Sequence, residues 1–138
     1  MSEPSALLTP AVRRFLEEAV RFATIATLGP DGRPHQAVIW YALVPDAILI
    51  NSRVGRRWPT ELMRDPRIAL TVTDPAIPPE RTVTILGEAV VAATGGAAQA
   101  DILALAKRYG SGARDFETHE RITFRIVPRS VSVHGDLG

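Results

Sequence analysis

The 138-residue sequence contains no cysteine and only one lysine, Lys107. The lack of cysteine excludes disulfide bonds, thiolate catalysis and cysteine-ligated zinc. Sixteen basic and fifteen acidic residues leave a net charge of +1, too balanced for a dedicated nucleic-acid-binding protein. No apolar run approaches membrane-spanning length, and the opening residues, MSEPSALLTP, lack the basic and then apolar pattern of a signal peptide. We therefore expect a cytoplasmic protein without a membrane or nucleic-acid partner.

Side-chain patterns that indicate catalysis are also scarce. His35, His119 and His134 are far apart in the sequence and show no metal-ligand spacing, so we expect no metal site. No serine lies in a nucleophile elbow, and there is no GxGxxG motif. Such a sequence suits an enzyme whose cofactor carries the chemistry, and it suits equally a ligand-binding protein that catalyses nothing.

The order of the predicted elements indicates a single domain, residues 1–138, with a mainly β (α+β) fold. Caps and apolar spacing predict helices from Thr9-Pro10 to about Arg21, from Trp58-Pro59 to about Arg64, and over Ala97–Tyr109. Strands are predicted at Phe22–Leu28, Pro34–Leu43, Ala47–Asn51, Ile68–Thr73, Arg81–Ala92, Arg121–Val127 and Val131–Val133. A loop is predicted over Asp74–Glu80, and Gly87 predicts a bulge. Six to seven mostly antiparallel strands with about three peripheral helices fit a small β-barrel.

Two strands have informative side-chain patterns. The centre of Pro34–Leu43 is apolar on both faces, with Val38 and Trp40 on one and Ile39 and Tyr41 on the other. A strand covered on both sides packs on the core one way and on a partner or ligand the other way, which predicts a homodimer. In Arg121–Val127, alternation predicts Ile122, Phe124 and Ile126 facing inward and Arg121, Thr123 and Arg125 facing outward, with Pro128 ending the strand.

The segment from Ile48 to Arg67 concentrates arginine. It contains five arginines and two acidic residues, so it carries a net charge of +3, whereas the rest of the chain carries −2. Arginine forks beside a helix start favour phosphate, because the guanidinium and the free backbone N–H groups both donate to its oxygens. A phosphate site for a nucleotide-like ligand and a solvated arginine-rich loop are both compatible with this segment alone.

Three strings, in this order and spacing, resemble a known family: FATIATLGPDGRPHQAVIWYAL, ILINSRVGRRWPTELMRDPRIALTV and ITFRIVPRSVSVHG. They resemble the split β-barrel proteins related to pyridoxamine 5′-phosphate oxidase, and within that group the branch of reductases that depend on the deazaflavin coenzyme F420. The resemblance implies an FMN-binding-like split β-barrel and a homodimer that binds two cofactors at the subunit interface. It also implies an oxidoreductase that transfers hydride to a small-molecule substrate.

The resemblance places the cofactor on two segments. Its ring lies against the second strand, which here means Gln36, Val38 and Trp40. Its phosphate lies at the turn and helix start after the third strand, which here means Asn51, Ser52, Arg53, Arg56, Arg57, Trp58 and Pro59. Many relatives have a lysine where this chain has Trp58; either Arg57 replaces its charge or Trp58 packs on the ring.

Three functions remain open on the sequence. The first is an F420-dependent reductase, the second an FMN-dependent oxidase or reductase of the same fold, and the third a non-catalytic carrier of a flavin, haem or other tetrapyrrole. Oxidation of pyridoxine phosphate itself is not expected, because only Arg129 and His134 stand where true oxidases have a longer substrate motif.

Overall fold

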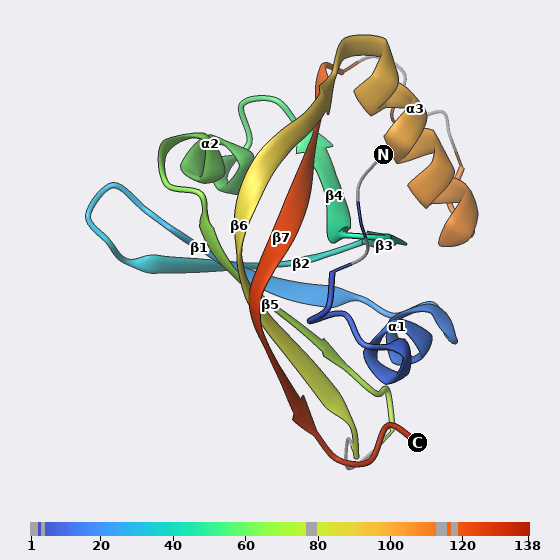
Figure 1. Cartoon of the computed structure of the whole chain (residues 1–138). Helices are drawn as coiled ribbons and strands as arrows, with labels where there is room; N and C mark the ends of the chain where they lie inside the picture. Colours follow the sequence, from blue (N-terminus) through green and yellow to red (C-terminus); the bar gives the residue numbers. More distant parts are fainter. Residues whose placement is uncertain (1–2, 4, 77–79, 113–115, 117–118) are drawn as a thin grey trace.

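A seven-stranded antiparallel sheet organises the chain (Figure 1). The computed structural model describes residues 3, 5–76, 80–112, 116 and 119–138; residues 77–79 of the predicted Asp74–Glu80 loop lie outside these. The strands are β1 (Ala23–Leu28), β2 (Pro34–Ile39), β3 (Ala42–Val44), β4 (Ala47–Arg53), β5 (Arg67–Thr73), β6 (Thr82–Thr94) and β7 (Arg121–His134). They are ordered β2-β1-β5-β6-β7-β4-β3, which confirms the predicted fold class.

The two edges of this sheet are neighbours in the sequence. β2 ends at Ile39 and β3 begins at Ala42, so only Trp40 and Tyr41 connect them. Because these edges lie at opposite ends of the strand order, the sheet must curl until they approach, which gives a split barrel. The curl encloses a core of apolar side chains from both ends of the chain, of which the largest fully buried are Tyr41, Phe15 and Phe124.

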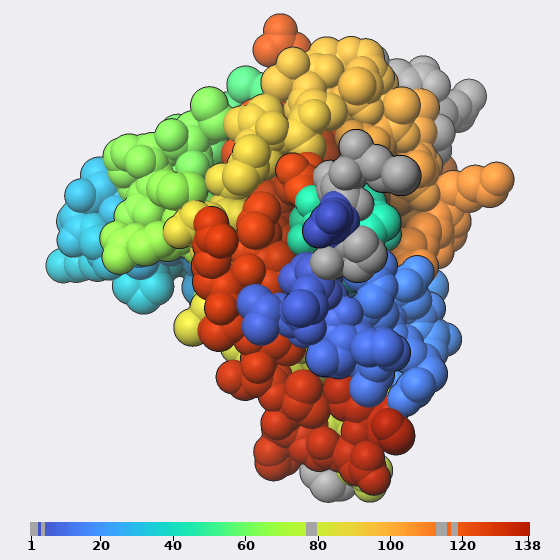
Figure 2. Space-filling view, viewed as in Figure 1, coloured from blue at the N-terminus to red at the C-terminus, as the bar shows by residue number. Residues whose placement is uncertain are grey.

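Three helices lie around the sheet: α1 (Pro10–Glu17), α2 (Arg57–Arg64) and α3 (Gly95–Arg108) (Figure 1). Thr9 caps α1 by accepting a hydrogen bond from the Val12 N–H. Figure 2 shows α1, in blue, beside the C-terminal part of β7, in red, and the Arg14 guanidinium donates to the carbonyls of Leu137 and Gly138. No helix in the described part of the chain is long and apolar enough to cross a membrane.

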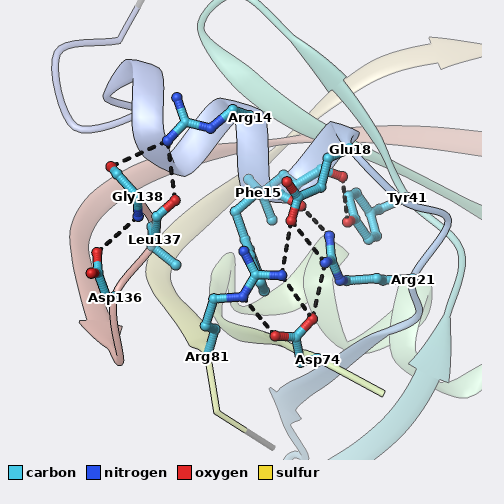
Figure 3. A network of polar contacts seen from close by, with 11 residues as sticks. Arg14, Phe15, Glu18, Arg21, Tyr41, Asp74, Arg81, Asp136, Leu137 and Gly138 are labelled. Atoms are coloured by element: carbon cyan, nitrogen blue, oxygen red, sulfur yellow. Dashed lines mark hydrogen bonds and ion pairs between the residues drawn. The ribbon is translucent and has the colours of Figure 1, made fainter. Parts of the chain in front are cut away.

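A polar network fixes the segment that follows α1 (Figure 3). The buried Arg21 bonds Glu18 and Asp74, both at 3.0 Å, and its guanidinium lies 4.2 Å from the centroid of the Phe15 ring. Arg81 closes the cluster, binding Asp74 at 2.6 Å and Glu18 at 3.0 Å. The hydrogen bond from Arg81 is the main reason that the pKa of Asp74 is lowered, and the bond from Arg21 does the same for Glu18. The network holds the segment after α1 against the residues that follow β5 and precede β6.

The structure corrects sequence-based predictions in four parts of the chain. The first helix ends at Glu17, not near Arg21, because the Arg21 side chain turns back and donates to the Phe15 carbonyl. Pro34–Leu43 is not one strand but two, and they lie on opposite sheet edges. α2 begins at Arg57, not at Trp58-Pro59, so Pro59 occupies its third position; the missing N–H of Pro59 is still one that a helix start leaves unbonded.

The fourth correction concerns β7, which continues through Pro128 to His134. Pro128 pairs with Gly87 at the bulge, where a Cβ on Gly87 would lie 2.5 Å from the Val127 carbonyl oxygen. A bulge leaves one position out of the regular ladder, so a residue without an N–H is tolerated. The alternation of the strand also predicts Arg121 and Thr123 facing outward, but both are buried, because α3 packs over that end of the strand.

Candidate functional site

A cleft of about 710 Å³ opens beside β2 and extends to the ends of β4 and α2 and to the inner side of α3. One group of lining residues is apolar or aromatic: Phe22, Ala37, Val38, Ile39, Trp40, Trp58, Ile102, Leu105 and Phe116. The other is polar or basic: His35, Asn51, Ser52, Arg53, Arg56, Arg57, Ser111 and Arg121. A planar apolar group that carries an anion matches this division of the lining.

The basic residues come mainly from the turn between β4 and α2. β4 ends at Arg53, Gly55 adopts a left-handed φ of 93°, and α2 begins at Arg57. Arg56 precedes the helix in an extended conformation and provides no side-chain cap, so the first N–H groups of α2 are left for another acceptor. Arg56 and Arg57 are exposed. A helix start with free N–H groups and flanking guanidinium groups favours an anion.

Arg121, from the start of β7, adds a buried charge to this cleft. It is 8% exposed, and its Nε has no hydrogen-bond partner among the described residues. Burial lowers the pKa of Arg121, and repulsion from Arg53 and Arg56 lowers it further. Within the described residues, these three arginines have no carboxylate within ion-pair distance. A charge that no described carboxylate compensates favours an anionic ligand.

Asn51 holds Arg121 in place. Its Oδ1 accepts from Arg121 at 3.3 Å, while its Nδ2 donates to the Ala98 carbonyl and to Thr123 Oγ1, both at 2.9 Å. Thr123 in turn donates to Asp101 of α3 at 2.7 Å. The Asn51 amide is thus engaged within the protein, so it orients the guanidinium rather than reaching into the cleft.

Aromatic rings line the other part of the cleft. Trp40 stacks on Tyr109, with ring centroids 5.0 Å apart and an interplanar angle of 11°, and the Phe116 ring meets Trp40 edge-on at 5.9 Å. The Tyr109 hydroxyl donates to the Arg21 carbonyl at 2.5 Å and accepts from the Tyr41 N–H at 3.1 Å. These bonds fix the end of α3 to the segment that joins β2 and β3, so the aromatic wall is held from both sides.

A histidine–carboxylate pair also belongs to the site. His35 lines the cleft, and its Nδ1 lies 3.1 Å from Oε1 of Glu61, a residue of α2 that is only 4% exposed. Thr27 Oγ1 donates to the same carboxylate oxygen at 2.7 Å, and Arg57 Nε lies 3.5 Å from the other. No local pattern indicates this pair, because its members are separated by 26 positions in the sequence.

The cleft brings together eight of the ten residues predicted to bind cofactor: Val38, Trp40, Asn51, Ser52, Arg53, Arg56, Arg57 and Trp58. Gln36 and Pro59 do not line it; Gln36 is exposed and Pro59 is buried in α2, and their contact with a cofactor stays a prediction. Trp58 is 7% exposed and packs 6.1 Å from the Phe124 ring, so most of it belongs to the core. The prediction missed Arg121 and His35, whose neighbours come from distant parts of the chain.

Solved structures of similar fold have varied functions. The chain is 23% identical to a protein named F420 reductase, with a TM-score of 0.74, covering 86% of this chain and 94% of that one. A conserved hypothetical protein, Rv2991 from Mycobacterium tuberculosis, is 23% identical with a TM-score of 0.75, covering 97% and 90%. HutZ, the haem storage protein from Vibrio cholerae, is 15% identical with a TM-score of 0.74, covering 93% and 95%. At such identities the likeness shows the fold alone.

Sequence comparison gives the family. No curated protein matches the chain. The family described as pyridoxamine 5′-phosphate oxidase, however, matches residues 8–134, nearly the whole chain and all seven strands. This match confirms the resemblance carried by the hairpin, the arginine segment and the closing strand. The chain belongs to the pyridoxamine 5′-phosphate oxidase family.

Proposed function

We propose that this protein is an oxidoreductase that binds coenzyme F420 in the cleft, at a homodimer interface, and uses it to reduce a small organic acceptor. The observation that carries the proposal is the charge of Arg53, Arg56 and Arg121, which no carboxylate of the described residues balances, beside an aromatic wall. F420 is a planar deazaflavin with one diester phosphate and an acidic oligoglutamate tail. Its anionic groups would balance the arginines, and its ring would occupy the apolar part.

The residues of the cleft would divide the work of binding. Arg56, Arg57 and the first N–H groups of α2 would hold the phosphate, and the positive charge of Arg121, which lines the same cleft, would attract a second anionic oxygen. Trp40, fixed by its stacking on Tyr109, would border the ring. The cofactor, when bound, supplies the hydride. The chain orients cofactor and acceptor and excludes water, a role that needs no nucleophile or metal.

A second copy of the chain would complete the site. Phe22 and Val38 line the cleft yet remain 59% and 67% exposed, which is unusual for large apolar side chains at a binding site. A partner subunit packed across β2 would cover them and close the cleft. The family resemblance implies the same arrangement.

Two alternatives use the same cleft. FMN also has a planar ring and a phosphate, so an FMN-dependent oxidase or reductase would use the same arginines. A non-catalytic carrier of a flavin, haem or other tetrapyrrole is the second alternative, and the haem storage protein HutZ has a similar fold.

Cofactor binding separates the three functions. The absorbance of the freshly purified protein, followed by fluorescence titration with F420, FMN and haem, should show that F420 binds most tightly. Reduced F420 bound to the protein should then be oxidised by at least one of a panel of quinones and enones. If FMN or haem binds more tightly than F420, that ligand would replace F420 in the proposal. If a cofactor binds but no acceptor oxidises it, the carrier function would be favoured.

A further inference from the structure

The buried carboxylate of Glu61 determines which nitrogen of His35 carries a proton. Burial by itself raises the pKa of Glu61, but hydrogen bonds from Thr27 and His35 outweigh it and hold the pKa below the ordinary 4.5. The side chain is therefore an anion near neutral pH and only accepts hydrogen bonds. Since Nδ1 of His35 lies 3.1 Å from Oε1, that nitrogen carries the hydrogen in both the neutral and the charged imidazole.

The other nitrogen of the ring, Nε2, remains for the cleft. Nε2 has no hydrogen-bond partner within the described part of the chain. The His35 side chain is 23% exposed, and it lines the cleft together with Arg56 and Arg57. When His35 is neutral, Nε2 is a hydrogen-bond acceptor, which suits no anion. When His35 is protonated, Nε2–H is a charged donor like the guanidinium groups beside it.

Charged groups of both signs lie around His35. From α2 it faces Glu61 and Arg57, and from β1 its neighbour is the uncharged Thr27. Arg53, Arg56 and Arg121 line the same cleft, while Asp31 and Arg33 in the adjacent turn pair with each other. The carboxylate of Glu61 thus attracts a positive charge on His35, and the guanidinium groups of the cleft repel it. An anion bound between them would reverse that opposition.

We infer that His35 is a protonation-dependent donor of the anion site, and that binding of a phosphate-bearing ligand takes up a proton on His35. The inference rests on the proposed function, because it needs an anion in the cleft. It adds that binding tightens as the pH falls through the range in which histidine titrates. For one proton, the effect is limited to about tenfold in Kd per pH unit.

The test measures binding and proton uptake, with F420 and FMN as probes. Calorimetric titration of the wild-type protein in two buffers of different ionisation enthalpy gives the protons taken up, and Kd is measured from pH 5.5 to pH 8. The same measurements are made on His35→Gln, which keeps a hydrogen-bond donor for Glu61 but cannot be charged. The difference between the wild-type protein and this variant removes the contribution of the ligand's own titration. His134→Gln is the matched control, because His134 is exposed at the far end of β7.

We expect the wild-type protein and His134→Gln to take up a larger fraction of a proton than His35→Gln. Their Kd should fall about tenfold more than that of His35→Gln between pH 8 and pH 6. Equal proton uptake and parallel pH profiles for all three proteins would overturn the inference while leaving the proposed function intact. Failure of both cofactors to bind the wild-type protein would overturn both. If His35→Gln does not fold, the wild-type and His134→Gln proteins must each still take up a fraction of a proton after subtraction of the titration of the free ligand, and no uptake by either would overturn the inference.

Discussion

Replacing Arg121 by methionine should separate the binding role of this residue from a role in folding. Methionine retains an unbranched chain of similar length that fills the same space beneath α3, but it removes the guanidinium. If Arg121 is there for an anion, the substitution should weaken ligand binding and leave the empty protein about as stable as before. If Arg121 is structural, the reverse should hold.

In the protein without ligand, the losses and gains in the free energy of unfolding caused by Arg121→Met nearly cancel. The variant loses one hydrogen bond, from Arg121 to Asn51 at 3.3 Å, worth about 0.5–1.5 kcal/mol. It also loses the contact of the guanidinium with the Phe116 ring at 5.1 Å, worth about 0.5–1 kcal/mol. The variant also gains stability, because it removes a buried N–H that has no partner among the described residues, which costs about 1–3 kcal/mol, and because it relieves the repulsion from Arg53 and Arg56. The free energy of unfolding should therefore change by less than about 1 kcal/mol.

Ligand binding has no such compensation. A hydrogen bond between charged groups contributes about 1.5–3 kcal/mol, so Kd for the cofactor should rise roughly 10- to 150-fold. Arg121→Lys should recover only part of this, because an ammonium lacks the planar fork and Asn51 is placed for a guanidinium.

Urea unfolding without ligand and fluorescence titration with cofactor give the two quantities. Arg129→Met serves as the control, since Arg129 lies on the same strand but is exposed and pairs with Glu88; both quantities should stay near wild type. A large loss of stability in Arg121→Met with unchanged cofactor affinity would refute our explanation of the buried charge.

The arginine turn, the exposed apolar residues and the network around Arg21 each support a further prediction. Replacing Arg56 and Arg57 together by alanine should weaken cofactor binding by about 2–4 kcal/mol with little change in stability, measured by titration and thermal melting. Arg64→Ala with Arg67→Ala removes the same charge outside the cleft, and an equal loss there would mean a general charge effect. Light scattering at micromolar concentration should give twice the 15.0 kDa of one chain, and a monomer would contradict the dimer. The pKa values of Asp74 and Glu18 are lowered in the folded protein, so the ionised carboxylates stabilise the fold at a pH above their ordinary pKa values of 3.8 and 4.5. This contribution to stability is lost as the pH falls through the lowered pKa values. Thermal melting from pH 7 to pH 3 should therefore show a smaller acid sensitivity for Asp74→Asn than for wild type or the exposed control Glu17→Gln.

The parts of the fold that the sequence predicts correctly depend on local chemistry. The cap at Thr9 and the end of α2 at Arg64 need only neighbouring residues, and each is where expected. The arginine turn is also local, because strand, glycine and helix start follow one another within the segment. Its concentration of charge is therefore evident from the residues alone.

The missed features depend on contacts between distant segments. Alternation along β7 indicates two faces but cannot show that α3 covers the face with Arg121 and Thr123. Nothing local indicates that Gly87 stands opposite Pro128 and lets the strand continue. The pairing of His35 with Glu61 likewise depends on β2 and α2, which are distant in the sequence, lying close together in the fold.

The two tryptophans of the chain have different surroundings, which has a practical consequence for spectroscopy. Trp40 is partly exposed at the cleft, stacked on Tyr109, so its emission should respond first to an occupant of the cleft. Trp58 also lines the cleft, but it is 7% exposed and packs on Phe124, so in the ligand-free protein its emission should shift to the red when the core opens to water. In a ligand-free Trp40→Phe variant, Trp58 would be the single fluorescent probe of folding. The fluorescence of Trp40 thus reports mainly on the cleft, and that of Trp58 in the ligand-free protein reports on unfolding of the core.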